Sequence, residues 1–332
     1  MRLLFYAILV AVLCQGRISQ AAGSDTWSAQ DTPSQSHDIN KPRIKRGVHW
    51  YRYPNKQTDS DQEKFAYALY QAGRLRRAAN AYQALVYAWP DSRKAAPAQL
   101  ALAKIQQKRG QYEDAFDEYQ YLIDNYPGQF NYAEVLEFQF QIASYLMHAR
   151  TGQFLILPGF QSPERALPLF EKIIRNAPSW GKAPLAQFNI ARIHEMNDNL
   201  EEAVTAYELL QNRYQSSPWA GQASFREAYS LFRLSDQRKN DENALNAARA
   251  ALVDFIRSYP ASPDVGQAET YLRTLNTRLT TMAFERALFY DRQSRRPEAA
   301  LLAYEDFLKN FPASEQAATA QQRIEQLRKT IR

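Results

Sequence analysis

The sequence predicts an all-α fold, a stack of about six helical hairpins closed by a C-terminal helix. Two observations predict it: one motif recurs along most of the chain, and its apolar residues have the spacing of a helix face. Each copy has a small residue, an apolar residue four positions later, another three beyond that, and usually a proline further on. The two clearest copies follow a turn glycine and contain Gly73, Ala78, Tyr82, Leu85 and Pro90, and then Gly110, Ala115, Tyr119, Leu122 and Pro127.

Each position of the motif has a mechanical role in a helical hairpin. The small residue lets the two helices approach closely, the aromatic and branched residues fill the groove against the next hairpin, and the proline ends the helix. Four further copies contain Ala166, Phe170, Ile173 and Pro178; Ala203, Tyr207, Leu210 and Pro218; Ala248, Leu252, Phe255 and Pro260; and Ala300, Tyr304, Phe307 and Pro312. Six copies therefore predict six hairpins.

The spacing between copies is irregular, which predicts inserted segments. Residues 150–163 should interrupt the third hairpin between its helices, and residues 235–242 should do the same in the fifth. The last run, from Ser314 to Arg332, is typical of the solvated terminal helix that repeat stacks require. We expect residues 59–218 to form hairpins 1–4, and residues 219–332 to form hairpins 5 and 6 with the terminal helix.

The N-terminus has the features of an export signal. Its apolar run, residues 3–13, would rise only about 16 Å as a helix, against roughly 30 Å of hydrocarbon, so it cannot span a bilayer. We interpret residues 1–21 as a signal peptide cleaved near Ala21, and the polar residues 22–58 as a disordered tether. The alternative is a lipoprotein signal, in which Cys14, the single cysteine, is lipidated; the residue before it is Leu13, where such signals prefer a small residue.

Composition and motifs argue against nucleic-acid binding and catalysis. The net charge of +6 is small for a chain of 332 residues and is spread over many helices, so we expect no nucleic-acid partner. The four histidines form no pair with metal-ligand spacing, and no HExxH, GxSxG, P-loop or GxGxxG motif occurs. His194 beside Glu195 is best interpreted as part of a half-exposed helix face. We therefore predict neither enzyme activity nor a cofactor or metal.

The hairpin-terminal tags carry a resemblance to a known family. The repeats resemble tetratricopeptide (TPR) repeats, whose fold is a right-handed solenoid. Three aromatic-Pro-x-Ser tags, an interrupted third hairpin and the long helical stretch 267–290 together resemble the BamD family; the tags are Trp89-Pro90-Asp91-Ser92, Tyr259-Pro260-Ala261-Ser262 and Phe311-Pro312-Ala313-Ser314. That family usually has five repeats, one fewer than the six copies found in this sequence.

The resemblance implies a scaffold on the periplasmic face of the outer membrane. Its implied partners are the outer-membrane protein that assembles β-barrels, its accessory lipoproteins, and unfolded barrel precursors. On the implied docking surface, the long helical stretch, we expect Arg273, Arg278 and Arg286 to meet an acidic partner domain. The alternative function is a periplasmic TPR adaptor of the cell-division or peptidoglycan machinery, which would be soluble and need no lipid.

A repeat stack also presents a groove lined by the first helix of each hairpin. Counting along the repeat, the inward positions predicted for this groove include Tyr67, Tyr70, Lys104, Lys108, Phe188 and Arg192. The tyrosines with the two lysines would suit a peptide that has aromatic side chains and a carboxylate. The alternative is that the tyrosines pack between hairpins.

Overall fold

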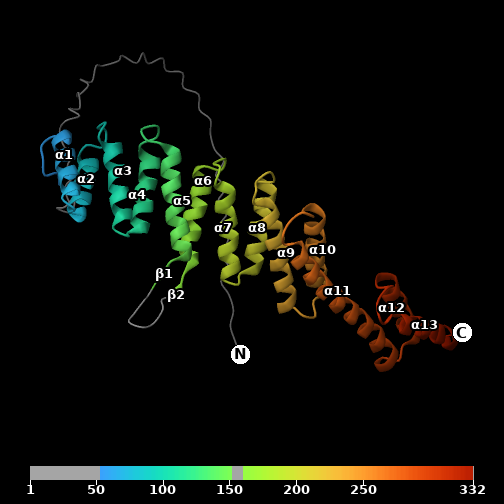
Figure 1. Ribbon diagram of the computed structural model, residues 1–332. Coiled ribbons are helices and arrows are strands. Elements are labelled where there is room, and N and C mark those ends of the chain that lie inside the picture. The colour runs from blue at the N-terminus through green and yellow to red at the C-terminus, as the bar shows by residue number, and fades with distance from the viewer. Residues whose placement is uncertain (1–52, 152–159, 332) are drawn as a thin grey trace, which may run out of the picture. The chain divides into compact units, whose positions relative to one another are not determined.

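The computed structural model describes residues 53–151 and 160–331, and these residues form successive helix pairs (Figure 1). The first two pairs are α1 (Asp59–Gln71) with α2 (Leu75–Ala88), and α3 (Ala95–Lys108) with α4 (Tyr112–Asn125). The fourth is α7 (Ala183–Met196) with α8 (Leu200–Arg213), and the fifth is α9 (Ala220–Gln237) with α10 (Glu242–Ser258).

The third and sixth hairpins depart from the simple pattern. In the third, α5 (Tyr132–His148) is followed by two short antiparallel strands, β1 (Arg150–Thr151) and β2 (Phe160–Gln161), and then by η2 (Pro163–Ala166) and α6 (Leu167–Asn176). In the sixth, α11 (Val265–Leu288) continues into the π-helix η3 (Phe289–Gln293) before α12 (Pro297–Asn310). The chain ends in α13 (Ala317–Ile331).

These elements confirm the all-α repeat fold and its terminal helix. The insertion in the third hairpin lies where the sequence predicted it, between α5 and η2. The insertion predicted at residues 235–242 is a short turn instead, because α9 extends to Gln237 and α10 begins at Glu242. The predicted signal peptide, Cys14 and almost all of the predicted tether lie outside the described residues.

The turns inside the hairpins need a backbone conformation that glycine adopts readily. Gly73 and Gly110 have φ values of +70° and +76°, which ordinary L-residues avoid. After each glycine the chain bonds back to the helix that it has left; the Arg74 N–H, for example, donates to the Leu69 carbonyl at 2.9 Å. In the fourth hairpin Asp198 takes the same position with φ +61°, which aspartate tolerates better than most residues.

The motif residues form the core, as the sequence predicted. The small residue of all six copies is 0% exposed, and these residues are Ala78, Ala115, Ala166, Ala203, Ala248 and Ala300. The aromatic residue that follows is buried beside it in five copies, and leucine takes its place in the fifth: Tyr82, Tyr119, Phe170, Tyr207, Leu252 and Tyr304. Within the described ranges, no helix combines the length and hydropathy needed to cross a bilayer.

Candidate functional site

The first helices of hairpins 1 and 2 bring two of the predicted groove residues into contact, and two more lie one turn away on the same helices. The ammonium group of Lys108, on α3, lies 5.1 Å from the centre of the Tyr70 ring, on α1. Tyr67 is one turn earlier on α1 and is 54% exposed, and its hydroxyl accepts a hydrogen bond from Gln71 Nε2 at 2.6 Å. With Lys104 these residues make up what we call the α1–α3 face.

The two lysines of this face differ in their partners. Lys104 pairs with Glu134 of α5 at 3.0 Å and lies 4.9 Å from the centre of the Phe138 ring. In the described ranges no carboxylate pairs with Lys108, whose charge meets only the Tyr70 ring. An exposed cation held over an aromatic ring can attract a carboxylate and an aromatic side chain at the same place.

Burial keeps the neighbouring aromatic residues in place. Tyr119 of α4 is 0% exposed and stacks on Phe138 with 5.3 Å between ring centres. Its hydroxyl donates to Gln107 Oε1 at 3.0 Å, and burial raises the pKa of Tyr119, so the group stays neutral. The Phe138 ring under Lys104 therefore stacks directly on the buried core of the repeat.

The structure corrects the prediction for Phe188. This side chain is only 4% exposed, because it packs against Tyr207 at 5.7 Å and Trp219 at 5.2 Å between ring centres. It belongs to the hydrophobic core between hairpins 4 and 5 and is not accessible to a peptide. The first helix of hairpin 4 is apolar on more than one side. Counting positions along the repeat therefore assigned Phe188 to the groove side, although it faces the core.

Arg192 lies in a charge cluster around a buried carboxylate. Glu195, 9% exposed, accepts a hydrogen bond from the Tyr207 hydroxyl at 2.7 Å and pairs with Arg226 at 3.2 Å and Arg192 at 3.9 Å. Burial, followed by the charge of Glu195, raises the pKa of Tyr207. The Nε atoms of both arginines are buried with no acceptor in the described part of the chain. The positive charge of Arg192 is therefore partly neutralised by Glu195 of its own helix.

Two of the three arginines predicted for docking pair within this chain. Arg278 of α11 contacts Asp236 at 2.6 Å and the Ser235 carbonyl at 3.0 Å, and Arg286 pairs with Glu242. Both contacts join α11 to residues that flank the turn between α9 and α10, at the end of α9 and the start of α10. Arg273 is exposed, and its guanidinium donates to the Thr270 hydroxyl at 3.1 Å. Of the three, only Arg273 has no acidic partner among the described residues.

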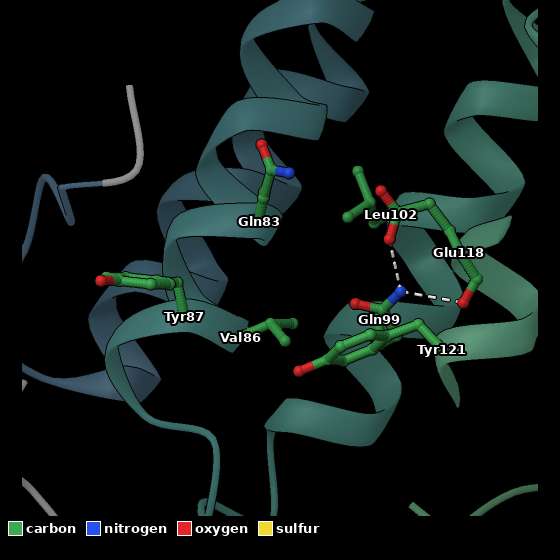
Figure 2. Close-up of a pocket in the computed structure, with 7 residues that line it drawn as sticks. All are labelled: Gln83, Val86, Tyr87, Gln99, Leu102, Glu118 and Tyr121. Atoms are coloured by element: carbon green, nitrogen blue, oxygen red, sulfur yellow. Dashed lines mark hydrogen bonds between the residues drawn. The ribbon is translucent and has the colours of Figure 1, made fainter. Parts of the chain in front are cut away.

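Two surface hollows lie elsewhere on the first two hairpins. One, of about 240 Å³, lies between α2, α3 and α4 (Figure 2) and is crossed by Gln99, whose Nε2 donates to the Glu118 carbonyl at 2.9 Å and to its carboxylate at 2.6 Å. The other, of about 600 Å³, lies at the turns and is lined by Gly73, Arg74, Leu75, Arg76, Arg77 and Arg109. This second hollow was not predicted from the sequence, although Arg76 and Arg77 occupy motif positions that hold acids in hairpins 2 and 4.

In the described ranges, no group of three or more His, Cys, Asp and Glu side chains could hold a metal ion. Asp198, the acid closest in sequence to His194 and Glu195, pairs with Arg233, and Glu195 is held by Tyr207 and Arg226.

Comparisons with known proteins agree with the repeat pattern. A family model described as an outer membrane lipoprotein matches residues 182–331, and a tetratricopeptide-repeat model matches residues 64–130. The outer membrane protein assembly factor BamD of Neisseria gonorrhoeae is 31% identical over 138 residues, which are 40% of this chain and 48% of that protein. BamD of Neisseria meningitidis serogroup B matches over the same length with the same identity. The aligned region spans about half the length of these relatives.

Solved structures also match at low identity. One is the C-terminal part of a TPR repeat-containing protein from Cytophaga hutchinsonii, with 15% identity, a TM-score of 0.34, and coverage of 79% of this chain and 87% of that one. Another is YrrB, a TPR protein with an unusual peptide-binding site, with 17% identity, a TM-score of 0.32, and coverage of 65% and 94%.

Proposed function

We propose that this chain, a BamD-like tetratricopeptide-repeat protein, is a non-enzymatic binding component of outer-membrane β-barrel assembly. In this proposal it acts on the periplasmic face of the outer membrane. The matched relatives are named as outer membrane protein assembly factors, which supports this role. In this proposal the chain docks onto the barrel-assembly protein and its accessory lipoproteins, and it receives segments of unfolded barrel precursors.

The α1–α3 face carries the proposal for precursor binding. Tyr67 and Tyr70 offer aromatic surface, and Lys108 offers a cation that no carboxylate of the described chain neutralises. An extended peptide with alternating aromatic side chains and a terminal carboxylate matches this chemistry, since stacking and charge pairing then act together. The C-terminal segment of a barrel precursor is such a peptide.

The experiment measures the affinity of a labelled peptide of that kind for the full chain. Changing Lys104→Glu together with Lys108→Glu should weaken binding by on the order of tenfold or more, because two attractive charges become repulsive. A matched control changes Lys309→Glu and Lys329→Glu, two exposed lysines of α12 and α13, and should leave the affinity near that of the unchanged chain. Equal affinity of both double variants would remove the α1–α3 face from the proposal.

In this proposal, α11 is the helix that docks onto the barrel-assembly protein. Arg273 carries this part, since Arg278 and Arg286 already pair with Asp236 and Glu242. A photo-crosslinker placed at position 273 should capture the barrel-assembly protein in envelope membranes, and one placed at the exposed Arg213 of α8 should not. If the product captured from position 273 belongs to the cell-division or peptidoglycan machinery, the alternative adaptor function replaces this one.

Cleavage near Ala21 would give a scaffold without a lipid anchor, and the alternative, lipidation at Cys14, would attach it to the membrane. Two acyl chains on a lipidated N-terminal cysteine would anchor the chain stably, because each buried methylene contributes about 0.8 kcal/mol. The intact mass of the mature chain distinguishes a lipidated N-terminus at Cys14 from an unmodified N-terminus near Ala22. The second result would leave the scaffold soluble in the periplasm.

A further inference from the structure

One type of ion pair recurs at the turns of the repeat. In three places an acid in the first turn of a hairpin's second helix pairs with an arginine from the following hairpin. The pairs are Glu113 with Arg165, Glu201 with Arg238, and Glu242 with Arg286. The position suits a carboxylate, because the N-terminal end of a helix carries partial positive charge.

The first hairpin breaks this rule. Arg76 and Arg77 stand two positions and one position before the motif alanine Ala78, where hairpin 2 has Glu113 and Asp114 before Ala115. The following hairpin still supplies an arginine, Arg109, so that cations face a cation across the turn. Hairpin 2 has an equivalent hollow at its turn, of about 250 Å³, but that hollow is lined by the paired Glu113 and Arg165, whereas the hollow of hairpin 1 has only cations among its charged lining residues.

The hollow has an unbalanced charge. Its volume is about 600 Å³, and its lining contains four arginines and no acid: Arg74, Arg76, Arg77 and Arg109. Within the described residues none of the four forms an ion pair; Arg109 Nη1 donates to Gln106 Oε1 at 2.6 Å. Four arginines that line one space repel one another through their charges, and a bound anion would relieve that repulsion.

We propose that this arginine hollow is a binding site for a phosphate-class anion, a phosphomonoester or phosphodiester group. Planar guanidinium groups bind phosphate oxygens in pairs, and several arginines together satisfy a tetrahedral group better than a single flat carboxylate. A peptide fits the lining poorly, because Leu75 is its one aliphatic side chain and no aromatic ring lines it. The site lies at the hairpin turns and does not depend on the proposed α1–α3 face.

Thermal melting of the full chain tests the site. At constant ionic strength, inorganic phosphate or pyrophosphate should raise the melting temperature above its value in chloride, since a ligand that binds only the folded state stabilises it. The double variant Arg76→Gln, Arg77→Gln should melt higher than the unchanged chain in chloride, because it loses like-charge repulsion, yet show no shift with phosphate. By calorimetry its phosphate affinity should fall by on the order of a hundredfold, about tenfold for each guanidinium removed.

A matched control separates this site from general charge. The variant Arg213→Gln, Lys239→Gln loses the same charge from two exposed positions outside the hollow, on α8 and in the turn after α9, and should keep the full phosphate shift. An unchanged phosphate shift in the Arg76/Arg77 variant, or an equal loss in the control, would overturn the proposal. So would an acidic, phosphate-free peptide that binds the hollow more tightly than pyrophosphate.

Vesicles identify the source of the phosphate. The site binds a lipid headgroup if the chain sediments with phosphatidylglycerol vesicles but not with neutral phosphatidylcholine vesicles. This sedimentation must also be lost in the Arg76/Arg77 variant and kept in the control. Phosphate binding without vesicle binding assigns it to a soluble phosphate compound. Vesicle binding reduced equally in both variants is non-specific attraction and counts against the site.

Discussion

The first four hairpins and the last two share one motif, but their hydrophobic cores are joined differently. A single cluster of buried residues runs from Ala66 to Ala223, through hairpins 1–4 into the start of α9. Beyond it the core divides in two, one cluster from Phe225 to Leu279 and another from Ala287 to Leu327. The two smaller clusters are bridged by α11, which contributes buried residues to both.

Buried polar contacts differ in the same way. In hairpins 1, 2 and 4 a buried glutamine of the first helix donates to a carbonyl of the second, at 2.9 to 3.1 Å: Gln62 to Ala81, Gln99 to Glu118, and Gln187 to Ala206. Between residues 220 and 331 no glutamine is buried. The motif thus defines each hairpin, whereas contacts beyond the motif determine how firmly neighbouring helices are joined. In a repeat protein those contacts also determine how far local unfolding spreads along the stack.

The largest expected effect separates the two regions. Phe170→Ala and Phe307→Ala each remove a fully buried ring of the same motif, and each should cost about 3–5 kcal/mol of the free energy of unfolding. Because the first core is continuous, Phe170→Ala should raise amide hydrogen exchange across residues 59–223 together. Phe307→Ala should raise it only from about residue 283 onward. Exchange that rises solely in the third hairpin after Phe170→Ala would contradict a continuous cooperative unit.

Most of the fold could be predicted because its determinants are local. The alanine-to-aromatic spacing of each copy specifies one hairpin, and in all six copies the small residue is fully buried. Turn glycines and the interruption after α5 are equally visible in one stretch of sequence. Local patterns of this kind need no knowledge of which hairpin lies beside which.

The site was harder to predict because it depends on neighbouring hairpins. Tyr70 and Lys108 are 38 positions apart in sequence. Consensus counting still placed them on one face, because the inward positions recur in each hairpin. Counting failed for Phe188, whose burial is decided by Trp219 of the next hairpin. Consensus counting also did not predict that Arg278 and Arg286 pair with Asp236 and Glu242, because side chains of α11 meet those of α9 and α10 only in the folded stack.

A second prediction concerns the last core, where one carboxylate joins three elements. Asp291 of η3, 6% exposed, accepts two hydrogen bonds from Arg323 at 2.7 Å and one from the Tyr304 hydroxyl at 3.3 Å. Asp291→Asn should cost about 1.5–3 kcal/mol, as expected for hydrogen bonds to a charged group. The control Asp306→Asn, at an exposed position of α12, should change the free energy of unfolding little. Equal losses in the two variants would mean that the Asp291 cluster adds no particular stability to the small core.

The Asp291 contact also predicts a pH dependence. The Arg323 guanidinium lowers the pKa of the Asp291 carboxyl below its ordinary value. A pKa that is lower in the folded than in the unfolded chain means that this stabilisation is present above the ordinary carboxyl range and is lost as the pH falls through the folded pKa. Exchange in residues 283–331 should therefore rise on acidification before exchange in the first core, and Asp291→Asn should remove that difference.

The smallest expected effect lies where the two regions meet. Glu227 of α9 accepts a hydrogen bond from Gln211 of α8, and burial, followed by the charges of Glu208 and Asp254, raises the pKa of its carboxyl. A raised folded pKa means that the contribution of this group is fully present below the unfolded pKa and is lost as the pH rises through the folded pKa, opposite in sign to Asp291. Glu227→Gln, which imitates the protonated form, should thus raise the melting temperature at pH 7 but leave it unchanged near pH 4. The control Glu202→Gln, at an exposed position of α8, should leave the melting temperature unchanged at both pH values. If Glu227→Gln gains as much stability at pH 4 as at pH 7, ionisation of Glu227 does not weaken the junction.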